Sequence, residues 1–257
     1  MINYADPLRW LVIQYKPGCG GKFLATAYST IDCVASWEPA YQSGDLSWTD
    51  YIDSLWNNNA ETHWMDHEPQ EPWGLSFFSR SVPRGKDLSI DDFNRLASKY
   101  GSDYFFDVYN QGLIFVDFYH SATLPEWWKS AYVIKLGADM QDPLWHKQLL
   151  QKVCVWDEKQ KLGMKIIDKP WTEDCMEAKF DNKWRFENFS DKQSWLRWAI
   201  QNDNRLNFEL PNPDIYLNDL FDFNCLNNHV KKIAQSLDSQ YNIDNLKYLY
   251  KHWVGKH

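Results

Sequence analysis

One segment near the N-terminus constrains the fold of this chain more than any other. Residues 10–15 form a short apolar run, WLVIQY, which leads into the glycine-rich turn PGCGG at 17–21 and then into residues with helical spacing. Glycine permits positive φ angles and close approach of the backbone, so successive N–H groups can converge on an anion at the start of the following helix. Lys22 adds a positive charge there. The segment predicts a strand, a phosphate-binding loop and a helix.

The residues around this lysine separate two kinds of phosphate loop. A magnesium-nucleotide loop of the form G-x-x-x-x-G-K-[ST] needs a hydroxyl after the lysine to hold the metal. Phe23 stands at that position here, and Lys16 stands where the first glycine of the pattern would fall. The motif fails at both ends, which disfavours a magnesium-dependent NTPase.

The segment instead resembles the 5′-phosphosulfate loop of the sulfotransferases, which reads Pro-x-x-Gly-x-x-aromatic-Leu directly after the first strand. Pro17, Gly20, Phe23 and Leu24 match this pattern. The resemblance implies that the nucleotide PAPS is the sulfuryl donor and that no metal is needed. The donor-binding residues it implies are Pro17, Gly18, Cys19, Gly20, Gly21, Lys22, Phe23 and Leu24. The alternative is a glycine-rich turn that binds no ligand.

Two further apolar runs, at 112–120 and 131–136, are continuous rather than alternating. This pattern is typical of strands that are buried on both faces of a parallel sheet. Ligands of such sheets lie beyond the carboxyl ends of the strands. We therefore expect residues 19–22, His120 and residues 137–139 to lie along one edge of the sheet.

The same stretch extends the resemblance. In cytosolic sulfotransferases a strand ends in a histidine, a Leu-Pro pair follows, and a hydrophobic strand then leads to the 3′-phosphate site. His120, Leu124 and Pro125 stand in this order before the run at 131–136. The resemblance implies that His120 is the catalytic base, a role that suits a side chain titrating near neutrality. Lys22 would stabilise charge on the bridging oxygen of the leaving nucleotide.

The chain also departs from the family. The family holds the 3′-phosphate of the donor with an arginine just after this strand and with a serine several residues later. Ala138 and His146 stand at these places here. Near the C-terminus, residues 214–221 and the amphipathic run 226–237 resemble the late strand of the family and the helix after it.

Helical spacing of apolar residues predicts a helix from Lys22 to about Trp37, a short helix at 48–56 and a capped helix at 89–97. The resemblance implies an α/β fold of the P-loop type, with three α/β/α layers around a central parallel sheet. We expect a single domain over residues 1–257, with a less regular insertion or lid at about 145–210.

Composition limits the partners. The net charge of −8 argues against a general nucleic-acid or anionic-membrane surface. No apolar run approaches the roughly 18 residues that cross a bilayer. The five cysteines are scattered without a C-x-x-C pair, which fits reduced thiols and a cytoplasmic location. The expected partner is a small-molecule or carbohydrate hydroxyl acceptor, with no nucleic acid and no membrane.

Two other readings stay open. The run LIFVD at 113–117 has the form of a strand whose Asp117 holds magnesium in an atypical P-loop kinase or NTPase. A degenerate P-loop protein could instead serve as a binding or structural module, for instance in a virus. His63 and His67 have a zinc-like i, i+4 spacing, but Pro69 ends any helix there and no third ligand is evident. We expect an acidic loop and no metal site.

Overall fold

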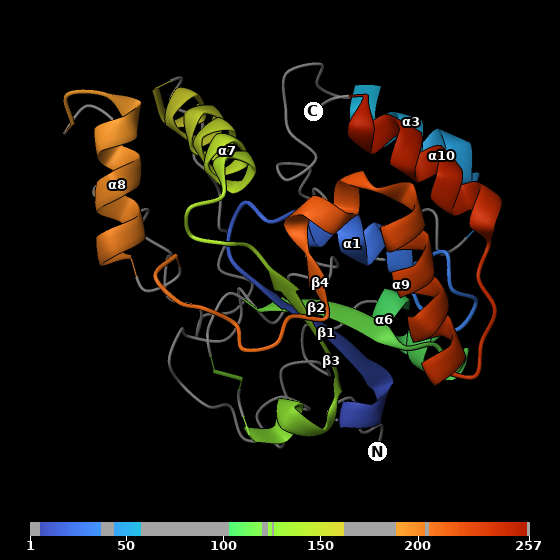
Figure 1. Ribbon diagram of the computed structural model, residues 1–257. Coiled ribbons are helices and arrows are strands. Elements are labelled where there is room, and N and C mark those ends of the chain that lie inside the picture. The colour runs from blue at the N-terminus through green and yellow to red at the C-terminus, as the bar shows by residue number, and fades with distance from the viewer. Residues whose placement is uncertain are drawn as a thin grey trace.

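A four-stranded, all-parallel sheet with helices packed against it forms the centre of the protein (Figure 1). The structure is a computed structural model, and it describes residues 6–36, 44–57, 103–119, 123–124, 126–161, 189–203 and 206–255. The order of the strands across the sheet is β2-β1-β3-β4. The protein therefore has an α/β fold with a parallel sheet, as the sequence predicts.

Three of the strands lie at the apolar runs that predict them, and the fourth lies in the late segment 214–221. They are β1 (Trp10–Tyr15), β2 (Phe115–Tyr119), β3 (Tyr132–Gly137) and the two-residue β4 (Ile215–Tyr216). In β1, Val12 pairs with Asp117 of β2 on one side and with Val133 of β3 on the other. The central position of β1 fixes where the glycine-rich turn emerges.

β1 is buried on both faces. All six of its residues are buried, and the five apolar ones divide between two hydrophobic clusters. Leu11, Ile13 and Tyr15 face the larger cluster, whereas Trp10 and Val12 face a smaller one. The Trp10 ring stacks on Phe115 with centroids 4.7 Å apart. Burial on both faces is what a continuous apolar run predicts for an inner parallel strand.

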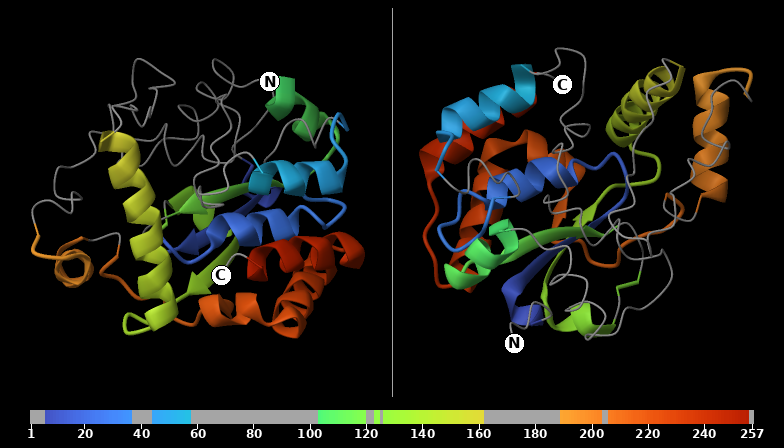
Figure 2. Two further views of the ribbon diagram at one scale, coloured as in Figure 1. Left: turned by 90° about the horizontal axis from the view of Figure 1, so that it is seen from above. Right: turned by 180° about the vertical axis from the view of Figure 1, so that it is seen from behind.

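Helices cover both faces of the sheet. The larger cluster receives buried side chains from α1 (Gly21–Tyr28), α3 (Trp48–Asn57), α7 (Pro143–Lys161), α8 (Lys192–Asn202), α9 (Phe223–Ser236) and α10 (Ile243–Val254). Figure 2 shows α1, α3, α9 and α10 gathered on one side of the strands. The other face is covered, within the described residues, by α6 (Asp103–Asn110) and by the 3₁₀ helix η3 (Glu126–Ser130).

α1 is shorter than the sequence predicts. The expected helix to about Trp37 is wrong, because α1 ends at Tyr28. The hydroxyls of Ser29 and Thr30 donate to carbonyls of the last helical turn at 2.8 and 2.6 Å, which gives these carbonyls a partner other than the next helical N–H. Ile31 and Val34 then form isolated β-bridges to distant segments. Tertiary pairing replaces the helical hydrogen bonds that their spacing suggested.

Other local expectations are met in part. The helix expected at 48–56 is α3, and the late segment contains β4, the 3₁₀ helix η6 (Leu217–Phe221) and α9. The helix expected at 89–97 lies outside the described residues. The expected lid at about 145–210 contains most of α7 and all of α8, whose buried residues Trp145, Leu149 and Trp195 belong to the main core.

A single arginine ties the start of the sheet to α6. Arg9 ends the 3₁₀ helix η1 (Pro7–Arg9), and its guanidinium donates to the carbonyls of Val108, Tyr109 and Leu113. It also lies 4.8 Å from the centroid of the Tyr109 ring. Because helix C-termini carry orphan carbonyls and partial negative charge, a guanidinium is a suitable cap there.

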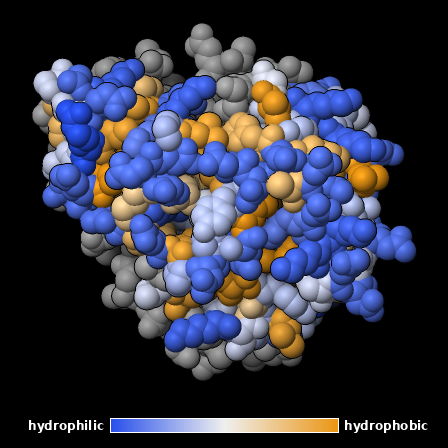
Figure 3. All heavy atoms as spheres, viewed as in Figure 1, coloured by the Kyte–Doolittle hydropathy of each residue, from blue (hydrophilic) through white to orange (hydrophobic). Residues whose placement is uncertain are grey.

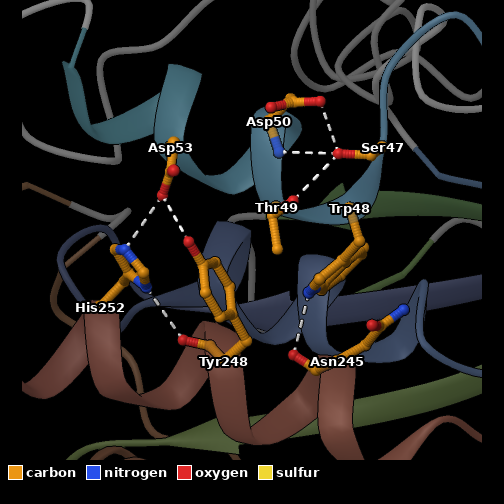
Figure 4. A network of polar contacts seen from close by, with 8 residues as sticks. All are labelled: Ser47, Trp48, Thr49, Asp50, Asp53, Asn245, Tyr248 and His252. Atoms are coloured by element: carbon orange, nitrogen blue, oxygen red, sulfur yellow. Dashed lines mark hydrogen bonds and ion pairs between the residues drawn. The ribbon is translucent and has the colours of Figure 1, made fainter.

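A polar network fastens α3 to α10 (Figure 4). The Tyr248 hydroxyl donates to Asp53 at 2.8 Å, and His252 Nε2 lies 3.2 Å from the same carboxylate oxygen. The Trp48 indole donates to the carbonyl of Asn245 at 3.0 Å. Hydrogen bonding to Asp53 raises the pKa of Tyr248, so the phenol remains a donor at neutral pH. The network aligns the two helices side by side.

The face of the protein seen in Figure 1 is mixed in character. Figure 3 shows hydrophilic residues interspersed with apolar ones over the face viewed in Figure 1. Large exposed apolar side chains among the described residues are Leu8, Tyr132, Tyr216, Ile243 and Val254. No helix in the described parts of the chain combines the length and apolar character needed to cross a membrane.

A buried pair joins α1 to α9 and makes stability depend on pH. The Tyr28 hydroxyl and His229 Nε2 lie 2.6 Å apart. Burial lowers the pKa of His229 to about 4, from an ordinary value near 6.5. Between these values the unfolded chain binds the proton more readily than the folded one, so stability falls as the pH falls from about 6.5 towards 4. At about pH 5 the loss is about 2 kcal/mol relative to neutral pH.

We expect urea unfolding to show this loss between about pH 7 and about pH 5. His229→Gln removes the titrating ring, so the stability of the variant should change less over that interval. The difference between the two slopes isolates His229 from the carboxylates, which titrate in both proteins. Equal slopes in the wild type and the variant would contradict the assignment.

Candidate functional site

The glycine-rich turn lies at the carboxyl end of the central strand. β2 flanks β1 on one side, and β3, followed by β4, flanks it on the other. The chain leaving β1 therefore returns on the β2 side, while the chain leaving β3 continues to the opposite side. A crevice forms outside the carboxyl ends where successive connections diverge in this way, and it is the usual ligand site of an open parallel sheet. The turn at 16–20 lies at this point.

The first half of the turn has the features of a type II β-turn. The N–H of Cys19 donates to the carbonyl of Lys16 at 3.2 Å, which brackets Pro17 and Gly18 at the two corner positions. Gly18 has φ +88°. Proline fixes the φ that the first corner requires, and the second corner requires a positive φ that favours glycine. Pro17 and Gly18 therefore have a local structural role.

The second half of the turn starts α1. Gly20 is the N-cap residue with φ +77°, and it provides no side chain to cap the helix. The first N–H groups of a helix have no partner within the helix, and they carry partial positive charge. Gly20 has no side chain that could accept from these groups, and helix N-termini of this kind are suited to binding anions.

Protein side chains occupy the space that these glycines leave. A Cβ on Gly21 would overlap the Tyr15 ring, and a Cβ on Gly18 would lie 3.2 Å from the backbone of Leu149. A Cβ on Gly20 would lie 3.2–3.3 Å from Leu220 of η6 and Trp253 of α10. The glycines thus permit close packing of Tyr15 and of three helical elements against the turn.

The remaining residues of the loop motif fall into two groups. Cys19, Phe23 and Leu24 are buried in the hydrophobic core, and the Phe23 ring stacks on Trp253 with centroids 4.4 Å apart. Lys22 is partly exposed in the first turn of α1, and its carbonyl accepts a hydrogen bond from Thr26. Among these four residues, only Lys22 has a charged side chain that could contact an anion at the start of α1.

A second lysine, which the motif did not single out, lies beside the turn. Lys16 follows β1 directly and is only 2% exposed. Its Nζ lies 3.5 Å from the carbonyl of Ala138, just beyond β3, and 5.0 Å from the centroid of the Trp145 ring. Burial lowers the pKa of Lys16, against the opposing effects of Cys19, Glu209 and Asp139. The sequence feature that could have indicated this site is a lysine directly after the apolar run of a buried strand.

α7 closes over the loop from the other side. The Trp145 indole donates to the carbonyl of Pro17 at 2.9 Å, and Leu149 contacts Gly18. Between these two residues lies Gln148, which is fully buried. Neither Oε1 nor Nε2 of Gln148 has a hydrogen-bond partner within the described part of the chain. Sequence alone could not indicate this, since glutamine at helical spacing predicts an exposed position.

The predicted edge of the sheet is present in part. Lys16 reaches Ala138, which brings the ends of β1 and β3 together as expected. His120, the predicted catalytic base, lies outside the described residues, as do His63 and His67. His146 lies in the first turn of α7, with Nε2 2.6 Å from the carbonyl of Met140.

Asp117 occupies the middle of β2 rather than its end. It is fully buried opposite Val12, and strand alternation places it on the same face as Phe115, away from α1. Its charge contributes to raising the pKa of Tyr15, for which burial is the larger cause. Among the described residues no cluster of three or more His, Cys, Asp or Glu side chains could hold a metal ion. The position gives little support to a magnesium role.

No known protein family, curated protein or solved structure shows significant similarity to this chain. The candidate site therefore has to be interpreted from its own geometry.

Paired glycine substitutions test how tightly α7 closes the loop. Gly18 and Gly44 have φ of +88° and +87°, but only Gly18 has a neighbour within 4 Å of a new Cβ, the backbone of Leu149. Alanine in the left-handed region costs about 1–2 kcal/mol at either position. We expect Gly18→Ala to lower the free energy of unfolding by about 1–3 kcal/mol more than Gly44→Ala. Urea denaturation measures both, and equal losses would show that α7 does not press on the turn.

Proposed function

We propose that this protein is a sulfotransferase-like enzyme that transfers a sulfuryl group from PAPS to a hydroxyl acceptor. The observation that carries the proposal is the start of α1, where a left-handed glycine cap with no capping side chain stands at the carboxyl end of the central strand. This is the arrangement that binds phosphate-type anions at helix N-termini. We also propose that the α/β fold is of the P-loop type, with three α/β/α layers.

Residues around the loop could bind both the 5′-phosphosulfate and the 3′-phosphate of PAPS. The first amides of α1 and the Lys22 ammonium would hold the 5′-phosphosulfate, without need of the magnesium hydroxyl that Phe23 replaces. PAPS supplies the sulfuryl group. Ala138 offers no guanidinium for the 3′-phosphate, but the Lys16 ammonium reaches its backbone. In this proposal, the Lys16 ammonium would take the place of the arginine that the resemblance leads one to expect.

The proposed reaction assigns a task to each catalytic residue. His120 takes the proton from the acceptor hydroxyl as its oxygen attacks sulfur in line. The new oxygen–sulfur bond forms while the bond between sulfur and the bridging oxygen of the donor breaks, and PAP leaves with the negative charge. Lys22 stabilises that charge as it develops.

A second candidate function rests on a specific observation. Leu149, Leu220 and Trp253 fill the space around the loop glycines, and Phe23 is part of the core. This packing favours a non-catalytic reading, in which the turn serves as a structural junction of a binding module. The two candidates differ in whether the loop binds a nucleotide.

Titration calorimetry with PAP and with Mg-ATP separates the candidates. A sulfotransferase-like site should bind PAP without metal, and Lys22→Ala should weaken that binding about 10- to 100-fold through the loss of a charge-assisted contact. Lys231→Ala, at an exposed position of α9, is the matched control and should bind like the wild type. Binding of Mg-ATP alone would favour the kinase reading, and binding of neither nucleotide would leave the structural one.

Turnover tests the assigned base. His120→Ala should abolish sulfuryl transfer to a hydroxyl acceptor while PAP binding stays near the wild-type level, because the base contacts the acceptor rather than the nucleotide. EDTA should have no effect. An activity that EDTA removes and that Asp117→Asn also removes would overturn the proposal in favour of metal-dependent phosphoryl transfer.

A further inference from the structure

We propose that the Lys16 ammonium is the cation that neutralises a bound phosphate or sulfate group in the crevice between the carboxyl ends of β1 and β3, with the Gln148 amide as its polar neighbour. The sequence motif assigns the positive charge to Lys22 instead. The inference deepens the proposed function and rests on it, since it names the residues that would hold an oxyanion of the ligand.

The position of Lys16 follows from the topology. The connections after β1 and after β3 diverge to opposite sides of the sheet, so the topological switch point, where open parallel sheets usually bind ligands, lies between the carboxyl ends of these two strands. The Lys16 ammonium spans that gap, because it extends from the end of β1 to within 3.5 Å of the Ala138 carbonyl beyond β3. Among the lysines whose burial the structure describes, Lys16 alone is buried.

Within the described residues, the Lys16 ammonium has no carboxylate at ion-pair distance. An ammonium group has three N–H donors. The described residues offer one carbonyl oxygen, that of Ala138, at the outer limit of hydrogen bonding. The described ion pairs do not include Lys16, and Glu209 and Asp139 act on it only through their more distant charges. A buried cation in this state is costly unless an anion accompanies it.

Two aromatic rings hold the ammonium in place without neutralising it. Nζ lies 5.0 Å from the centroid of Trp145 and 5.7 Å from that of Phe208. Both are within the range of cation–π attraction, which orients a cation but does not replace an anion. Trp145 is itself fixed by its bond to Pro17. The cation is thus preorganised beside the turn.

Gln148 supplies the second observation. It lies one turn of α7 after Trp145, and residues three apart on a helix are surface neighbours. Its next neighbour, Leu149, contacts Gly18. Both polar atoms of the Gln148 amide are buried without a partner in the described ranges, a state that folded proteins avoid unless a ligand or water meets it. Its N–H₂ group can donate to an oxyanion.

The lysine and the glutamine can each be replaced by an apolar side chain of similar length. Lys16→Met and Gln148→Leu remove the polar groups while largely preserving volume. If these groups serve a ligand, the ligand-free variants should be as stable as the wild type or more stable, because an uncompensated buried charge or amide is removed. If they serve internal contacts, both variants should be less stable.

Thermal unfolding in sodium sulfate and in sodium phosphate, against sodium chloride of equal ionic strength, tests the assignment. Sulfate and phosphate stabilise proteins in general, so the readout is the difference between variants at equal salt. We expect the melting temperature of the wild type to rise more than that of Lys16→Met, with Gln148→Leu in between. Lys129→Met, at an exposed position of η3 on the other face of the sheet, should respond like the wild type.

Several results would overturn the inference. They are an equal response of wild type and Lys16→Met to both anions, a Lys16→Met protein that unfolds at a clearly lower temperature or fails to fold, and a Gln148→Leu protein that keeps the full response. If Lys16→Met is poorly expressed, the response of Gln148→Leu to sulfate and phosphate still tests whether an anion binds beside the turn.

Calorimetry with PAP on the same variants separates this inference from the proposed function. If sulfate and phosphate act through Lys16 but PAP does not bind, the anion site stands and the sulfotransferase proposal fails. If PAP binds equally to wild type and Lys16→Met, the anion site fails while the proposed function stands. A loss of PAP affinity of about 10-fold or more in Lys16→Met supports both.

Discussion

The structure depends on the burial of β1 on both of its faces. Leu11 and Ile13 enter one core and Trp10 and Val12 the other, while β2 and β3 satisfy both edges of the strand. A strand in this position has no freedom of register, because a shift by one residue would exchange its two faces. The residue that follows it, Lys16, is therefore held at the centre of the carboxyl edge, and the turn begins there.

The turn combines the geometry of an anion loop with the packing of a structural junction. Pro17 and Gly18 make the chain reverse, Gly20 starts α1, and Tyr15 folds back over Gly21. α7, η6 and α10 then approach so closely that a Cβ on Gly18 or Gly20 would lie only 3.2 Å from its nearest neighbour. Close packing and phosphate binding both require a bare backbone, so glycine by itself does not distinguish them.

Buried polar groups distinguish an anion-binding loop from a structural junction. A purely structural junction gains nothing from a buried ammonium or a buried amide without partners, and apolar residues of the same length would stabilise it more. Among the described residues, the Lys16 ammonium has one hydrogen-bond partner, the Ala138 carbonyl at 3.5 Å, and the Gln148 amide has none. Trp145 and Leu149 hold α7, which carries the glutamine, against the turn. These two polar groups thus lie near the topological switch point of the sheet, where the ligands of open parallel sheets bind.

The sequence by itself determined the parallel sheet, because continuous apolar runs such as Trp10–Tyr15 are stable only when both faces are covered, and it determined the turn, because the order Pro17-Gly18 specifies its corner. It could not fix the end of α1, since the bridges of Ile31 and Val34 are made with residues far along the chain. Nor could it indicate that Lys16 is buried or that Gln148 faces no solvent. Burial and the partners of a charge depend on which helices cover an edge, and only the tertiary structure decided that.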